Sequence, residues 1–262
     1  MELDDAYANV PHIPGGAQYP ARWTVAAAAF RERLTAERRA EIGLRYGESP
    51  RQVFDLFHPK GTARGLCLFV HGGYWLRFDR SYWSHLAAGP LARGWSVAMP
   101  SYDLCPEVRI ADITRQIATA ITAAAARTEG PIALAGHSAG GHLVARMAVP
   151  GTLPGDVAAR LTHVMPISPV SDLRPLMQTT MNAQFGLDLS AAKAESPVLM
   201  RPLPVPVTIW VGAEERPVFL DQARWLAEAW GARHEVAQGR HHFDVIEPLA
   251  DPESRLITQL LG

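Results

Sequence analysis

One serine of the sequence stands in a setting that would make it a nucleophile. Residues 136–140 read Gly-His-Ser-Ala-Gly, so Ser138 lies at the centre of a G-x-S-x-G pattern. The apolar run 132–135 precedes the pattern, and the helix-like segment 139–149 follows it. A sharp turn from strand to helix needs small flanking residues and holds the serine in a strained conformation that projects its Oγ into a cleft. The pattern therefore predicts that Ser138 attacks a carbonyl carbon.

A second turn could stabilise the negative charge that such an attack creates. Residues 71–75 read His-Gly-Gly-Tyr-Trp and follow the apolar run 65–70. Consecutive glycines let backbone N–H groups face a cleft, and each preorganised donor is worth about 10²–10³ in rate. The turn has the form of the HGGG-type oxyanion turn, with Tyr74 in place of the third glycine. We expect three backbone N–H groups to form an oxyanion hole, those of Gly72, Gly73 and Ala139.

The serine also needs a base, and a carboxylate to orient that base. In enzymes with such an elbow the acid and then the histidine follow the serine along the chain. Glu214 and Glu215 follow the apolar run 205–211, and His241 and His242 lie further on. The histidine would take the serine proton, and the carboxylate would fix the histidine tautomer. The residues alone do not choose between Glu214 and Glu215 as the acid, or between His241 and His242 as the base.

Other kinds of site find no support in the composition or the motifs. The sequence has ten histidines but no H-E-x-x-H pattern and no Cys/His cluster, so we expect no metal. It has no G-x-G-x-x-G and no Walker loop, so we expect no organic cofactor. A net charge of −1 gives no long-range attraction to nucleic acid or anionic lipid. Two cysteines exclude a disulfide framework.

The elements that must position these residues predict an α/β fold. Short runs that are apolar on both faces indicate buried parallel strands at 65–70, 95–99, 132–135, 164–167 and 205–211. Helix-like segments lie between them at 82–93, 110–128, 139–149 and 219–230. This alternation predicts a mostly parallel central sheet with helices on both faces. Residues 51–57 alternate between apolar and polar, which favours an antiparallel edge strand.

The length of 262 residues fits a single domain over 1–262. Residues 1–44 are expected to form an N-terminal arm and helix, with no regular element over the Pro- and Gly-rich residues 1–20 and a helix over 21–44. The Met- and Pro-rich segment 171–204 is weakly patterned and is expected to be a small excursion that caps the site. No apolar stretch approaches the ~18 residues of a membrane span, and the acidic N-terminus has no signal-peptide pattern. We therefore expect a cytoplasmic protein.

Together these segments resemble the kynurenine formamidase (arylformamidase) branch of the α/β-hydrolases, near the hormone-sensitive-lipase-like esterases. The resemblance covers roughly residues 44–250. It rests on LRYG with VFDLFHP, on FVHGGYW, on SYDLCP, on GHSAGGHL, on ISPVSDLRPL, on VGAEERPVF and on GRHHFDVIE. It implies an α/β-hydrolase fold and a catalytic triad that needs no cofactor.

The resemblance also chooses between the paired candidates. In the family pattern the acid stands immediately before a residue-Pro pair that leads to a phenylalanine, which is the position of Glu215. The family histidine directly precedes Phe-Asp, which is the position of His242. The implied triad is therefore Ser138, Glu215 and His242.

The resemblance implies a serine hydrolase that removes a small acyl group through an acyl-enzyme on Ser138. The expected substrate is a small molecule, a formylated aryl-amide such as N-formyl-L-kynurenine. The alternative is a short-chain carboxylesterase for aryl or alkyl esters, and a catalytically inactive binding protein is a third reading. Tyr74 and Trp75 are candidate walls for an aryl ring, with a place in the core as the alternative. A homodimer is common among such enzymes, although no residue specifies an interface.

Overall fold

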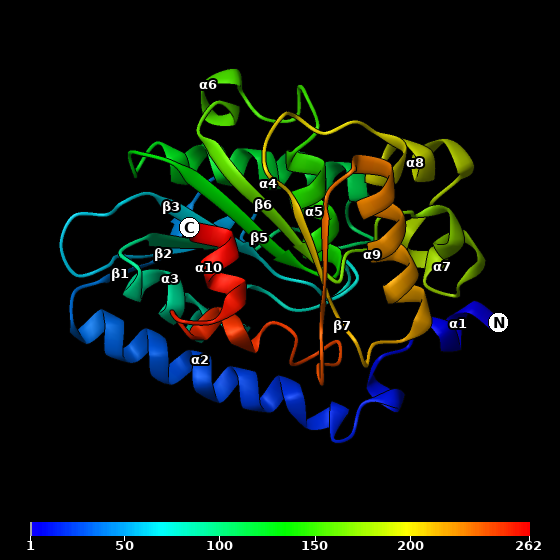
Figure 1. Cartoon of the computed structure of the whole chain (residues 1–262), viewed down its shortest axis with the longest axis horizontal. Coiled ribbons are helices and arrows are strands. Elements are labelled where there is room, and N and C mark those ends of the chain that lie inside the picture. Colours follow the sequence, from blue (N-terminus) through cyan, green and yellow to red (C-terminus); the bar gives the residue numbers. More distant parts are fainter. Residues whose placement is uncertain (1) are drawn as a thin grey trace.

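A twisted eight-stranded sheet runs through the centre of the protein, whose computed structural model describes residues 2–262 (Figure 1). The strands are β1 (Ala40–Arg45), β2 (Val53–Phe57), β3 (Leu66–Val70), β4 (Ser96–Pro100), β5 (Ile132–His137), β6 (Leu161–Ile167), β7 (Thr208–Gly212) and β8 (Arg233–Ala237). They lie in the order β1-β2-β4-β3-β5-β6-β7-β8. The β1–β2 and β2–β4 pairs are antiparallel, and the other pairs are parallel.

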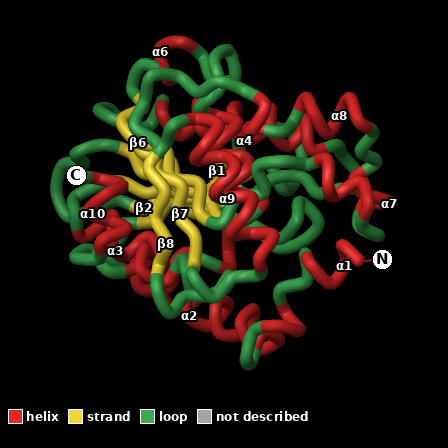
Figure 2. Tube along the Cα trace, turned by 45° about the vertical axis from the view of Figure 1, so that its right-hand side comes forward, coloured by secondary structure: helices red, strands yellow, loops and turns green. Residues whose placement is uncertain are grey.

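Helices cover both faces of this sheet. They are α1 (Glu2–Ala6), α2 (Tyr19–Ala36), α3 (Ala88–Ala92), α4 (Ile110–Ala125), α5 (Ala139–Met147), α6 (Gly155–Ala158), α7 (Asn182–Phe185), α8 (Leu189–Ala194), α9 (Pro217–Trp230) and α10 (Arg255–Leu261). Figure 2 shows the strands between two groups of helices. The helices α4, α5 and α9 pack on one face, and α2, α3 and α10 pack on the other.

Alternate residues of each central strand enter the two cores. In β3, Leu66 and Leu68 pack with α4 and α5, whereas Cys67 and Phe69 pack with α2, α3 and α10. Because both faces are covered, no residue of β3 needs to be polar, which explains the continuous apolar runs of the sequence. The predicted α/β architecture is confirmed, and the predicted helices over 110–128, 139–149 and 219–230 correspond to α4, α5 and α9.

The prediction of a helix over residues 21–44 is wrong for residues 37–44. The helix α2 ends at Ala36, and Arg38 has a φ of +56°, a left-handed conformation that stops the helical path. Residues 40–45 form β1, which pairs with β2. The antiparallel strand predicted over 51–57 is confirmed as β2, but β2 lies between β1 and β4, so its predicted edge position is wrong. Pairing with another strand decides both outcomes, and the local composition of each segment does not contain that information.

The N-terminal arm is more ordered than its composition suggests. The prediction that residues 1–20 form no regular element is wrong for the described residues among them, because α1 covers residues 2–6 and single 3₁₀ turns follow. Tyr7 is 3% exposed and belongs to the core that α4 and α5 share. The backbone N–H of Thr180 donates to Asp4 Oδ1 at 2.7 Å, so the arm is tied to the segment 171–204.

Three further elements differ from the sequence-based reading. The predicted helix over 82–93 is helical in α3 only, with 3₁₀ turns before it. The edge strand β8 and the helix α10 lie in sequence that gave no prediction. The segment 171–204 leaves the sheet between β6 and β7 and carries α7 and α8 (Figure 1).

Among residues 2–262, no helix has the length and apolar content that crossing a bilayer requires.

The strand that leads to the G-x-S-x-G turn contributes to stability through complete burial. Leu134 of β5 is 0% exposed, so the substitution Leu134→Ala should lower the free energy of unfolding by about 2–5 kcal/mol. Denaturant unfolding followed by circular dichroism measures this change. Val25→Ala is the control, because Val25 is 71% exposed and its truncation should change stability by no more than about 0.5 kcal/mol. Equal effects of the two substitutions would contradict this packing.

Candidate active site

Ser138 occupies a strained turn between β5 and α5. Its φ of +57° and ψ of −117° lie outside the regions that L-residues favour. Glycine is required on both sides of this turn because neighbouring backbone atoms leave no room for a Cβ. A Cβ on Gly136 would lie 2.2 Å from the Gly140 carbonyl oxygen, and a Cβ on Gly140 would lie 2.0 Å from the Val70 carbonyl oxygen. The turn therefore has the geometry of a nucleophile elbow.

The turn after β3 lies directly against this elbow. A Cβ on Gly72 would lie 3.0 Å from Ser138 Cβ and 2.8 Å from the His137 carbonyl oxygen. Gly73 has a φ of +109°, which glycine adopts without steric cost. The N–H groups of Gly72 and Gly73 donate to no other group among residues 2–262, and Ala139 opens α5, where an N–H has no helical partner. All three donors are free to receive an oxyanion.

His71 has a structural role beside this turn. Its ring stacks on Tyr102 at 4.3 Å between centroids, and its Nδ1–H donates to the Gly72 carbonyl oxygen at 2.8 Å. Burial lowers the pKa of His71 to about 4, so the ring is neutral at ordinary pH. His71 therefore holds the oxyanion turn in place and is not a base.

Glu215 and His242 form a buried pair at the carboxyl end of the sheet. His242 Nδ1 lies 2.5 Å from Glu215 Oε2. The other carboxylate oxygen, Oε1, accepts hydrogen bonds from the Gly212 N–H at 2.8 Å and from Ser168 Oγ at 2.5 Å. Both oxygens are thus engaged, and His242 is fixed in the tautomer that leaves Nε2 free to accept a proton. Ser168 was not singled out from the sequence, although it lies in the ISPVSDLRPL segment.

The neighbouring residues Glu214 and His241 point elsewhere. Glu214 is exposed. His241 Nδ1 accepts from the backbone N–H groups of Phe243 and Asp244 at 3.2 and 3.3 Å. Its Nδ1 also lies 3.2 Å from Asp244 Oδ1, and its Nε2 lies 3.1 Å from the Tyr19 hydroxyl. His241 fixes the turn that carries His242, and the structure brings Glu215 together with His242 alone.

The His242 ring packs against the elbow. Its centroid lies 4.6 Å from the ring of His137, the residue before Ser138, and 4.2 Å from the ring of Phe219. Within residues 2–262, Ser138 Oγ forms no hydrogen bond to His242, and such bonds are often long before substrate binds. Burial, followed by the nearby His242 ring, lowers the pKa of His137 well below its usual value, so His137 stays neutral.

The two aromatic candidates for the substrate pocket occupy different environments. Trp75 is 0% exposed and packs edge-on against His142 at 5.1 Å and Phe185 at 5.7 Å between centroids. This is the core position that was its alternative reading, so Trp75 does not line an open pocket. Tyr74 is partly buried and donates its hydroxyl proton to the Tyr7 carbonyl oxygen at 2.7 Å. The N-terminal arm therefore reaches the oxyanion turn, a contact that the sequence did not indicate.

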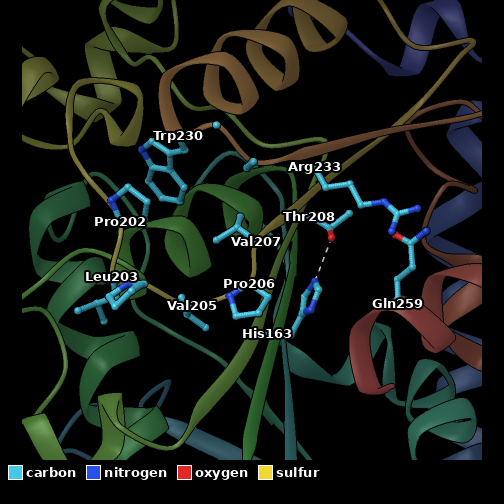
Figure 3. Close-up of a pocket in the computed structure, with 13 residues that line it drawn as sticks. His163, Pro202, Leu203, Val205, Pro206, Val207, Thr208, Trp230, Arg233 and Gln259 are labelled. Atoms are coloured by element: carbon cyan, nitrogen blue, oxygen red, sulfur yellow. Dashed lines mark hydrogen bonds between the residues drawn. The ribbon is translucent and has the colours of Figure 1, made fainter.

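A cleft of about 560 Å³ lies at the other end of the sheet (Figure 3). It opens at the amino ends of β7 and β8, where His163 Nε2 lies 3.0 Å from Thr208 Oγ1. Parallel sheets of this type bind substrates at the carboxyl ends of their strands, where Ser138 and Glu215 lie. The cleft is therefore separate from the candidate site. Among residues 2–262, no group of three or more His, Cys, Asp or Glu side chains is arranged to hold a metal.

Comparison with known sequences finds related hydrolases. Residues 67–202 match the sequence profile of the alpha/beta hydrolase fold family. The kynurenine formamidase of Drosophila melanogaster is 33% identical over 80% of this chain and 77% of its own length. The kynurenine formamidase of Danio rerio is 24% identical over 88% of this chain and 83% of its own length.

Solved structures agree with this relationship. A protein of Silicibacter sp. TM1040, described as a candidate thioesterase, superposes with a TM-score of 0.98 at 60% identity, and all of both chains is covered. Esterase 2 of Thermogutta terrifontis superposes with a TM-score of 0.61 at 22% identity over 78% of this chain and 84% of its own. The second likeness shows the fold alone.

The close contact between the elbow and the oxyanion strand predicts that Gly140 tolerates no side chain. Gly140→Ala should lower the free energy of unfolding by about 1–3 kcal/mol, because the new methyl group would collide with the Val70 carbonyl oxygen. Thermal unfolding measures this loss. Gly155→Ala is the matched control, since a Cβ there has open space and the residue begins the short helix α6. A Gly140→Ala protein as stable as Gly155→Ala would refute this contact.

Proposed function

Because this chain belongs to the alpha/beta hydrolase fold family, we propose that it is a serine hydrolase with Ser138 as nucleophile, His242 as base and Glu215 as the orienting acid. The observation that carries this proposal is the 2.5 Å contact between His242 Nδ1 and Glu215 Oε2 beside the strained turn at Ser138. A neutral serine is a weak nucleophile, and an adjacent oriented histidine is the usual means of activating it.

The reaction proceeds in two halves. Ser138 Oγ attacks the substrate carbonyl carbon while His242 Nε2 takes the hydroxyl proton, and Glu215 stabilises the imidazolium. The resulting oxyanion is held by backbone N–H groups of the turn at Gly72 and of Ala139. His242 then protonates the leaving group, which departs and leaves an acyl-enzyme. A water molecule activated by His242 releases the acid and restores Ser138.

We propose that the acyl group is formyl and that the leaving group is an aryl amine, as in N-formyl-L-kynurenine. Support comes from the similarity to kynurenine formamidases along most of the chain. The surroundings of Ser138 agree with a small acyl group, because Ser138 and His242 are each 3% exposed. An amide also needs His242 as acid, since an amine leaves only after protonation.

Two alternatives use the same residues. A short-chain carboxylesterase is the first alternative, because an ester can be cleaved by the same nucleophile, base and oxyanion turn. The protein with a TM-score of 0.98 supports a thioesterase, because it is described as a candidate of that type. A thiolate can leave without protonation, so loss of the acid function of His242 should harm thioester cleavage less than amide cleavage.

The substrate class can be tested with one enzyme preparation. We expect kcat/KM to be larger for N-formyl-L-kynurenine than for p-nitrophenyl acetate or acetyl-coenzyme A. A fluorophosphonate should label the wild type and leave Ser138→Ala unlabelled. Formamide turnover at background beside rapid ester or thioester turnover would replace the formamidase proposal with the corresponding alternative. Absence of any adduct on Ser138 would contradict the serine hydrolase itself.

The paired residues provide matched controls for the assigned roles. His242→Ala should lower kcat by about 10³-fold or more, because triad members act as a unit, whereas His241→Ala should cost far less. Glu215→Gln should likewise cost more than Glu214→Gln, since only Glu215 contacts His242. Steady-state kinetics on the best substrate measures all four variants. An inactive His241→Ala beside an active His242→Ala would reverse the assignment of the base.

A further inference from the structure

Ser168 lies where the strand beside the elbow meets the strand that leads to the acid. It follows β6 directly, and its side chain is fully buried. Its backbone N–H donates to the Trp210 carbonyl oxygen of β7 at 2.7 Å. The preceding residue, Ile167, accepts a hydrogen bond from the Ser138 N–H at 2.8 Å. The end of β6 is therefore joined to the nucleophile on one side and to the acid-bearing strand on the other.

Glu215 needs more restraint than an aspartate would in the same role. A glutamate has one more methylene group and one more rotatable bond, so its carboxylate can take more orientations. Ser168 Oγ and the Gly212 N–H both donate to Oε1, at 2.5 and 2.8 Å. With Oε1 held by two donors, Oε2 faces His242 Nδ1. Ser168 supplies the only side-chain donor to Oε1 within residues 2–262.

The backbone conformation of Ser168 suggests that its hydroxyl is the reason for a serine at this position. Its φ is +47°, in the left-handed region that favours glycine. A glycine there would avoid the steric cost, so serine must contribute through its side chain. The Oγ makes one hydrogen bond among the described residues, the one to Glu215. Strained backbone that serves a contact of this kind is typical of functional sites.

We propose that Ser168 is a positioning residue for the hydrolase reaction, one that holds Glu215 in the orientation that His242 requires. This inference rests on the proposed function, because it presupposes that His242 takes the proton of Ser138. The Ser168 hydroxyl donates to Oε1 before the proton is transferred and while the imidazolium exists. Glu215 therefore faces the developing positive charge without having to reorient.

Ser168→Ala and Ser168→Gly both remove the donor but differ in their effect on the backbone. Alanine retains the strained conformation, whereas glycine relieves it. We expect both variants to lower kcat by about 10- to 100-fold with little change in KM, the range for losing one hydrogen bond to a charged group. Ser171→Ala is the control, because Ser171 is an equally buried serine near the same strand end that bonds to Gln222 instead of Glu215.

Three further measurements separate positioning of Glu215 from a general structural effect. In the Glu215→Gln background, adding Ser168→Gly should cost no more than about 2-fold, because residues that act through one another are not additive. The low-field proton resonance of the His242 Nδ1–H should shift in both Ser168 variants and stay in place in Ser171→Ala. Thermal unfolding of Ser168→Gly should match the wild type, which keeps the test valid if Ser168→Ala fails to fold.

The outcomes distinguish this inference from the proposed function. A Ser168→Gly enzyme with wild-type kcat would overturn the inference, because only the backbone would then matter. An equal loss with and without the Glu215→Gln substitution would also overturn it. Either result could occur in an enzyme whose Ser138 reacts normally with a fluorophosphonate. If the wild type forms no such adduct, the proposed function fails instead.

Discussion

Two backbone hydrogen bonds at the carboxyl end of the sheet determine the geometry of the candidate site. The Ser138 N–H donates to the Ile167 carbonyl oxygen, and the Ser168 N–H donates to that of Trp210. These two bonds connect the ends of β5, β6 and β7. The strands β6 and β7 share a single register pair, Ile167 with Trp210. The loops that carry Ser138 and Glu215 are therefore both held by the carboxyl end of the sheet. A site built on rigid elements has a more precise geometry than a site on free loops.

Steric constraint at the same edge explains why glycine recurs there. The backbone of α5 approaches the end of β3 so closely that Gly140 can carry no Cβ, and Gly212 lies equally close to the Arg240 carbonyl oxygen. These approaches bring the turn after β3, the elbow, the turn after β7 and the turn at Arg240 together at the carboxyl end of the sheet. The resulting site contains neutral His71 and His137 beside His242, and burial is the first cause of the lowered pKa of both.

The sequence predicted elements best where both faces of a strand are buried. Runs such as 65–70 and 132–135 became β3 and β5, because a strand between two helix layers has no polar side. Prediction failed at the periphery. The sequence predicts a helix end where β1 lies and no element where β8 lies, because an edge strand is defined by its partner and its own composition can be polar, as in RHEVA. The order in residues 2–20 likewise comes from contacts with distant segments, such as the one between Tyr7 and Tyr74.

The sequence by itself determined the candidate residues of the site: a serine in a glycine-flanked turn, a second glycine turn, and acid and histidine candidates in the expected order. Tertiary structure decided which of two adjacent candidate residues faces the protein interior. Glu214 and Glu215 differ by one position, yet one is exposed and the other reaches His242, because adjacent side chains leave the backbone in different directions. The buried position of Trp75 and the contact of Ser168 with Glu215 also depend on segments far apart in the chain, and spacing along the sequence carries no information about such contacts.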